Sequence, residues 1–178
     1  MVKKPANFFI KIARSGVVAA MYAALTLAVP SASFGLVQFR VAEALTILPV
    51  FDPAAIAGLT VGCAVSNTVG LAMGANIAGA FDILFGTLAT FAAAWLTYWL
   101  RKIRFKGLPL LSTLPPVILN AVVVGLELTL ALYGFSWRKF MLAAAYVGIG
   151  QFAACTVCGL VLYAALHRSG AYRHLFGG

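Results

Sequence analysis

Ten side chains in this chain belong to residue types that bind small polar molecules and lie in or beside apolar segments. Three are carboxylates, four are amides, one is a guanidinium and two are aromatic rings. They are Arg40, Glu43, Asn67, Asn76, Asp82, Asn120, Glu127, Trp137, Tyr146 and Gln151. An ionisable side chain inside a bilayer costs several kcal/mol unless it is paired or hydrated, so each charged member is a candidate binding residue.

The composition indicates which elements must position these side chains. The chain has 178 residues, of which 63% are hydrophobic and 10% are charged, and its mean hydropathy is +1.00. A soluble domain has about 25% charged residues, and a water-soluble globule of this size could not bury so much apolar surface. We therefore predict an all-α membrane protein with one integral membrane domain over residues 1–178.

The net charge of +9 restricts the class of partner. In a soluble protein it would suggest nucleic acid, but in a membrane protein basic residues favour the cytoplasmic side. We expect a multi-pass protein of the cell membrane with no nucleic acid partner. The sequence contains no Gly-Lys pair, so it has no P-loop and no recognisable ATPase of its own.

Hydropathy predicts six membrane helices, of which the second is the least regular. It carries Arg40 and Glu43 and is barely long enough to span a bilayer. The predicted helices cover about 15–30, 34–51, 53–74, 77–100, 113–133 and 140–166.

The distribution of Lys and Arg tests whether segment 34–51 crosses the membrane. With six crossings and the N-terminus inside, ten basic residues fall on the inner side and two, Arg138 and Lys139, on the outer side. If segment 34–51 does not cross, six of the same twelve basic residues fall on the inner side and six on the outer side. The positive-inside rule therefore favours a six-transmembrane-helix bundle with both termini cytoplasmic. The ten inner residues are Lys3, Lys4, Lys11, Arg14, Arg101, Lys102, Arg104, Lys106, Arg168 and Arg173.

This topology places several polar residues at one level near the outer face, where they predict an outward-opening polar pocket. They are Arg40, Glu43, Asp82, Glu127 and Gln151. The alternative is local: Arg40 and Glu43 neutralise each other on one helix face, and Asp82 caps a helix. Trp137 and Tyr146 lie at the same level, where an interfacial aromatic belt is the alternative to a ligand platform.

Small residues recur every four positions in two of the predicted helices. The first helix carries Gly16, Ala20, Ala24 and Ala28, with Ala19 and Ala23 on the adjoining ridge, and the third carries Gly58, Gly62, Ser66, Gly70 and Gly74. Such stripes let helix backbones approach closely. For the third helix we predict packing inside the bundle. For the first helix, internal packing and docking of a partner helix both stay open.

The three cysteines, Cys63, Cys155 and Cys158, lie inside apolar segments. The C-x-x-C spacing of the last two has no second pair, and both histidines lie beyond it. We predict buried thiols rather than a disulfide framework, and we predict no metal site and no cofactor.

Two stretches of the sequence resemble a known family. Residues 38–49 read QFRVAEALTILP, and residues 82–90 read DILFGTLAT. Together with Ser66-Asn67 and Gly70 between them, these stretches resemble the QueT family. Its members are substrate-binding S-components of energy-coupling-factor (ECF) importers, associated with queuosine precursors.

The resemblance implies a six-helix subunit that captures its ligand near the outer face and delivers it inward. A separate transmembrane coupling subunit and two cytoplasmic ATPases are the implied partners, which fits the missing P-loop. In this class an A-x-x-x-A pattern on the first helix docks the coupling subunit. Ala20 and Ala24 match that pattern, and Ala19 and Ala23 form the other register, with Gly16 at the basic end of the stripe.

The implied ligand is of the 7-deazaguanine type. Its guanine-like edge presents adjacent N–H donors that a carboxylate can accept, and amide side chains can satisfy its carbonyl and ring nitrogen. Glu43, Asp82 and Glu127 are the candidate acceptors. If the ligand carries an aminomethyl group, a second carboxylate would balance that cation, and Trp137 or Tyr146 could stack on the ring.

Three alternatives stay open. The chain could be an S-component for another vitamin-like solute, because pocket details set the specificity. It could be an intramembrane enzyme, but no span holds a nucleophile with a His base or a metal motif, so we expect no enzyme. It could also be a structural membrane subunit without a ligand, in which case the polar cluster should be wholly paired with itself.

Overall fold

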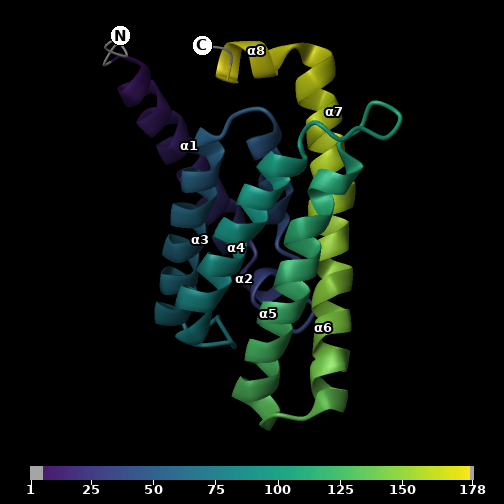
Figure 1. Ribbon diagram of the computed structural model, residues 1–178. Helices are drawn as coiled ribbons and strands as arrows, with labels where there is room; N and C mark the ends of the chain where they lie inside the picture. Colours follow the sequence, from purple (N-terminus) through teal and green to yellow (C-terminus); the bar gives the residue numbers. More distant parts are fainter. Residues whose placement is uncertain (1–5, 177–178) are drawn as a thin grey trace.

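A computed structural model describes residues 6–176, and every regular element in this part of the chain is a helix (Figure 1). The elements are α1 (Ala6–Ala28), α2 (Pro30–Ser33), η1 (Val41–Val50), α3 (Ala54–Ala72), α4 (Phe81–Leu100), η2 (Leu110–Thr113), α5 (Leu114–Tyr133), α6 (Trp137–Gln151), η3 (Phe152–Cys158), α7 (Gly159–Ser169) and α8 (Ala171–Phe176). Two of them, η1 and η2, are 3₁₀-helices, and η3 is a π-helix. The predicted all-α class is therefore confirmed.

Five helical stretches are long and apolar enough to cross a membrane: Phe8–Ala28, Ala54–Ala72, Phe81–Leu100, Leu110–Leu132 and Trp137–Ser169. They match five of the predicted helices to within a turn, except that α1 begins well before residue 15. Their outer faces carry exposed large apolar side chains such as Trp99, Ile149 and Val161. Such a surface suits contact with lipid rather than with water.

The predicted helix over 34–51 is wrong as a continuous membrane helix. Residues 34–40 have no regular helix, and η1 is a 3₁₀-helix of ten residues, about 20 Å at the usual rise of this helix type. That is shorter than the roughly 30 Å of a hydrocarbon core. Eight of its ten residues are buried by neighbouring helices. Irregular backbone is tolerated at membrane depth only where protein covers it, and here it is covered.

The helices α1 and α3 nevertheless run in the same direction. The Ser15 hydroxyl donates to the Ala54 carbonyl at 2.8 Å, and Gly62 packs on Tyr22 further along both helices. The segment between them must therefore return along the bundle. The beginning of α1 and the end of α8 consequently lie at the same end (Figure 1).

Four of the five small residues predicted to pack inside the bundle do so, since α3 buries Gly58, Gly62, Ser66 and Gly70. The prediction is wrong for Gly74, which lies beyond the end of α3, is exposed and has nothing within 4 Å of an added Cβ. A Cβ added at Gly58 would lie 2.6 Å from the Ser15 carbonyl oxygen, and one at Gly62 would lie 2.8 Å from the Ala19 carbonyl oxygen. At Gly70 it would lie 2.5 Å from the Phe34 ring. These glycines allow the close approach of α1 and of the residues that follow α2.

Basic residues are concentrated at the end of the bundle where α8 ends. Lys11 and Arg14 are in the first turns of α1, the 101–106 group follows α4, and Arg168 is in the last turn of α7. Arg138 and Lys139 begin α6 at the opposite end. Lys3 and Lys4, also predicted on the inner side, lie outside the described residues. Which end faces the cytoplasm stays a prediction.

Candidate functional site

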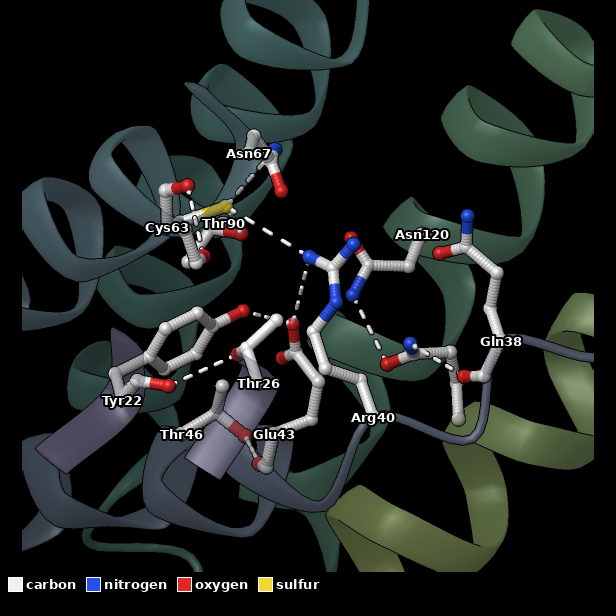
Figure 2. A network of polar contacts seen from close by, with 12 residues as sticks. Tyr22, Thr26, Gln38, Arg40, Glu43, Thr46, Cys63, Asn67, Thr90 and Asn120 are labelled. Atoms are coloured by element: carbon white, nitrogen blue, oxygen red, sulfur yellow. Dashed lines mark hydrogen bonds and ion pairs between the residues drawn. The ribbon is translucent and has the colours of Figure 1, made fainter. Parts of the chain in front are cut away.

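A buried polar network joins α1, η1, α3 and α4 inside the bundle (Figure 2). The Tyr22 hydroxyl donates to Glu43 Oε1. Arg40 Nη1 lies 3.9 Å from the same carboxylate oxygen, and Arg40 Nη2 lies 3.6 Å from Asp82 Oδ2. None of these residues is more than 3% exposed. The structure therefore brings together three of the residues predicted to share one level: Arg40, Glu43 and Asp82.

The 3₁₀ geometry of η1 aligns its polar side chains. With three residues per turn, residues three apart lie above one another on one face. Arg40, Glu43 and Thr46 have this spacing, and the Thr46 hydroxyl donates to the Glu43 carbonyl at 2.6 Å. The local ion pair predicted as the alternative therefore exists, but Arg40 also reaches Asp82 on another helix.

Two amides hold Asp82 at the start of α4. Asn76 Nδ2 donates to Asp82 Oδ2 at 2.9 Å, and Asn67 Nδ2 donates to the Asp82 carbonyl at 2.7 Å. The Asp82 carboxylate lies back over its own helix, where a Cβ at Gly86 would be 1.9 Å from Oδ1. Gly86 is therefore needed for this orientation.

The Cys63 thiol is part of the network, a role that the sequence analysis missed. Its sulfur lies 3.3 Å from Thr90 Oγ1, 3.5 Å from Asn67 Nδ2 and 3.9 Å from Arg40 Nη1. All three cysteines are free, and Cys63 and Cys155 are buried as predicted, while Cys158 is partly exposed. Within residues 6–176, no group of three or more His, Cys, Asp or Glu side chains is placed to hold a metal ion. The sequence signal for Cys63 was its place one turn before Asn67.

A second polar group adjoins the network on the side of α5 and α6. Asn120 Nδ2 donates to Gln151 Oε1 at 3.0 Å, and Gln151 Nε2 donates to the Gln38 carbonyl at 3.4 Å. Residues 37 and 38 approach α6 closely, since a Cβ at Gly150 would lie 2.1 Å from the Val37 carbonyl oxygen. Asn120 and Gln151 thus hold the segment that leads into Arg40; Figure 2 shows Asn120 and Gln38 beside Arg40.

The predicted aromatic residues lie elsewhere. Trp137 is 69% exposed and packs edge to face on Phe135 and Phe140 at the end of the bundle. Tyr146 is 47% exposed. Phe34 is the buried aromatic next to the site, with its ring centre 5.2 Å from Arg40 Cζ. The spacing of residues in the sequence does not predict this role for Phe34, because Phe34 lies in irregular backbone just after the short helix α2.

Glu127 lies beside this network on α5. It is 7% exposed, and it lines a groove of about 290 Å³ between α4 and α5. Its electrostatic neighbours are Asp82 and Arg40. No described residue donates a hydrogen bond to either of its carboxylate oxygens.

Several buried polar atoms in this region have no hydrogen-bond partner among the described residues. The donors are Gln38 Nε2 and Arg40 Nε and Nη2, and the acceptors are Glu43 Oε2, Asn67 Oδ1, Asp82 Oδ1 and both oxygens of Glu127. A buried polar atom without a partner costs about 1–3 kcal/mol. So many unpaired donors and acceptors in one place can be satisfied together by a compact polar ligand.

The small-residue stripe of α1 divides into two registers. Gly16, Ala20 and Ala24 are exposed, and nothing lies within 4 Å of a Cβ placed at Gly16. Ala19 and Ala23 are half-buried, and the Ala19 backbone packs on Gly62 of α3. Internal packing thus accounts for Ala19, while Gly16, Ala20 and Ala24 face outward.

A family model described as QueT transporter matches residues 12–168. No curated protein and no solved structure gives a significant match. The match includes all five long apolar stretches nearly in full, and with them the whole polar network. The chain therefore belongs to the QueT transporter family, and it is a multi-pass membrane protein.

Proposed function

We propose that the chain is the substrate-binding S-component of an ECF-type importer, capturing a queuosine precursor of the 7-deazaguanine type at the outer face. The observation that carries this proposal is the set of buried, unpaired donors and acceptors around Arg40. A purely structural subunit would be expected to pair such atoms internally, because hydrocarbon penalises polar atoms without partners. The unpaired atoms therefore favour a ligand.

The chemistry of the network suits a guanine-like base. Glu43 Oε2 and Asp82 Oδ1 are unpaired acceptors for the adjacent N–H donors along one edge of such a base. Arg40 Nε and Gln38 Nε2 are unpaired donors for its carbonyl and ring nitrogen. The buried Phe34 ring beside Arg40 offers a face on which a flat base can stack.

The outward register of α1 is the proposed docking face for the coupling subunit. Gly16, Ala20 and Ala24 form an exposed small-residue strip on which another helix can lie closely. The coupling subunit and two cytoplasmic ATPases would supply the energy source that a chain without a P-loop lacks. Ala20→Leu should prevent co-purification with the coupling subunit and leave ligand binding unchanged. Val65→Leu, on the exposed face of α3, is the matched control and should have neither effect.

The first test is calorimetric titration of the purified protein with 7-aminomethyl-7-deazaguanine, its 7-cyano analogue and guanine. We expect saturable binding that Glu43→Gln weakens by at least about tenfold, because a charged acceptor of paired N–H donors is lost. Asp52→Asn is the matched control, since Asp52 pairs with Arg14 at the other end of the bundle.

Two results would contradict the proposal. Riboflavin, biotin or thiamine binding in place of the deazaguanines would show an S-component for a different solute. Equal affinity in native protein and Glu43→Gln would show that the ligand site lies elsewhere. Size-exclusion chromatography of each variant in detergent establishes that it is folded before titration.

A further inference from the structure

The region around Arg40 contains more buried negative charge than positive charge. Three carboxylates, Glu43, Asp82 and Glu127, are at most 7% exposed, and Arg40 is the one buried guanidinium among the described residues. Arg40 lies within 4 Å of two of these carboxylates and contacts neither oxygen of Glu127 by hydrogen bond or ion pair. Charge buried in hydrocarbon is retained only with a counter-charge or a bound proton.

Of these three carboxylates, Glu127 is the one with no hydrogen-bond partner for either oxygen among the described residues. Its groove between α4 and α5 is walled by apolar side chains, among them Phe81, Phe85, Leu126 and Leu130. The two phenylalanine rings are stacked with their centres 6.3 Å apart. One carboxylate flanked by aromatic rings is a suitable environment for an organic ammonium group, which combines a charge-assisted hydrogen bond with cation–π attraction.

The groove and the polar network share helix α4. Phe81 immediately precedes Asp82 at the start of α4, and Phe85 lies one turn later beside Gly86. Glu127 interacts electrostatically with both Asp82 and Arg40. A ligand whose base is held by Arg40, Glu43 and Asp82 can therefore extend a short substituent toward Glu127.

We propose that Glu127 is the counter-ion that makes the site select a base bearing a protonated primary amine over its neutral analogue. This inference rests on the proposed function, since it concerns the same site. An aliphatic primary amine is protonated at neutral pH and has three donors for the Glu127 carboxylate. With the amine bound, the excess of buried negative charge is reduced. The alternative is that Glu127 holds a proton and has no part in selectivity.

The test compares the affinity of native protein for 7-aminomethyl-7-deazaguanine and 7-cyano-7-deazaguanine by calorimetry. We expect native protein to prefer the amine by at least about tenfold, the size of one charge-assisted hydrogen bond. Glu127→Gln should abolish that preference and leave the affinity for the cyano analogue within about twofold. Glu127→Asp keeps the charge and should keep most of the preference. Asp52→Asn should leave the ratio unchanged.

The outcomes separate this inference from the proposed function. If both deazaguanines bind but native protein does not prefer the amine, Glu127 is not a counter-ion and the S-component proposal stands. If Glu127→Gln weakens both ligands equally, the residue acts through packing and the inference is overturned. If neither ligand nor guanine binds to folded native protein, the proposed function fails and this inference fails with it.

Discussion

At the scale of single residues, Tyr22 shows how the protein holds a carboxylate in an apolar bundle. Its side chain is fully buried on α1, and its hydroxyl is the hydrogen-bond donor to Glu43 Oε1. The other Glu43 oxygen has no partner among the described residues. One oxygen is thus held by the protein, and the other is the acceptor that we propose for the ligand.

Tyr22→Phe tests this division of roles. Removal of the hydroxyl leaves Glu43 Oε1 without its hydrogen-bond donor, so we expect the free energy of unfolding to fall by about 1–3 kcal/mol. Ligand affinity should fall as well, because Glu43 is no longer oriented. Denaturant unfolding in detergent and calorimetry measure the two effects. Tyr146→Phe, at a half-exposed position outside the network, should change neither quantity; a similar loss in both variants would contradict the assignment.

At the scale of elements, the parallel contact between α1 and α3 positions the network. Tyr22 and Cys63 come from these two helices, and the contact depends on glycines at which the backbones nearly touch. Gly62 and Gly16 belong to the same kind of stripe but differ in surroundings: Gly62 packs on α1, whereas Gly16 faces open space.

Substitution by alanine should therefore have opposite effects at these two positions. A Cβ at Gly62 would lie 2.8 Å from Tyr22 Cβ and from the Ala19 carbonyl oxygen, so Gly62→Ala should destabilise the protein by about 1–3 kcal/mol. Gly16→Ala should stabilise it by about 0.5–1 kcal/mol, because glycine is a poor helix former. Thermal unfolding of the two variants gives the comparison. Destabilisation by Gly16→Ala would mean that this face is already packed.

At the scale of the whole molecule, the start of α1 and the end of α8 lie at one end of the bundle. The return of the chain from α1 to α3 is made by residues 29–53, which contain no long apolar helix. The buried network depends on this segment, because the segment contains Gln38, Arg40, Glu43 and Thr46. Without this segment, the network would lose its guanidinium, Arg40, and the Glu43 carboxylate.

The orientation of the bundle can be tested by labelling intact cells with a membrane-impermeant maleimide. We expect Arg138→Cys to be labelled from outside and Lys106→Cys to be protected, because the end rich in basic residues should be cytoplasmic. Both positions are exposed. Unsubstituted protein is the control, since two of its thiols are buried and Cys158 lies within a long apolar stretch. The reverse labelling pattern would invert the proposed route of transport.

The sequence by itself determined the membrane class, the five long apolar helices and the placement of Arg40, Glu43 and Asp82 at one level of the bundle. These follow from local properties: hydropathy summed over a window, and the high cost of an ionised group in hydrocarbon, which forces such residues together.

Only the tertiary structure decided the conformation of η1 and the rest of the site. Residues 34–51 are apolar enough for an α-helix, but burial of eight of the ten η1 residues by neighbouring helices lets a 3₁₀-helix and an irregular segment stand in its place. The same burial brings Phe34, Tyr22 and Cys63 to Arg40, while Trp137 and Tyr146 stay at the surface. Such contacts join residues far apart in the chain, and no periodic pattern in the sequence predicts them.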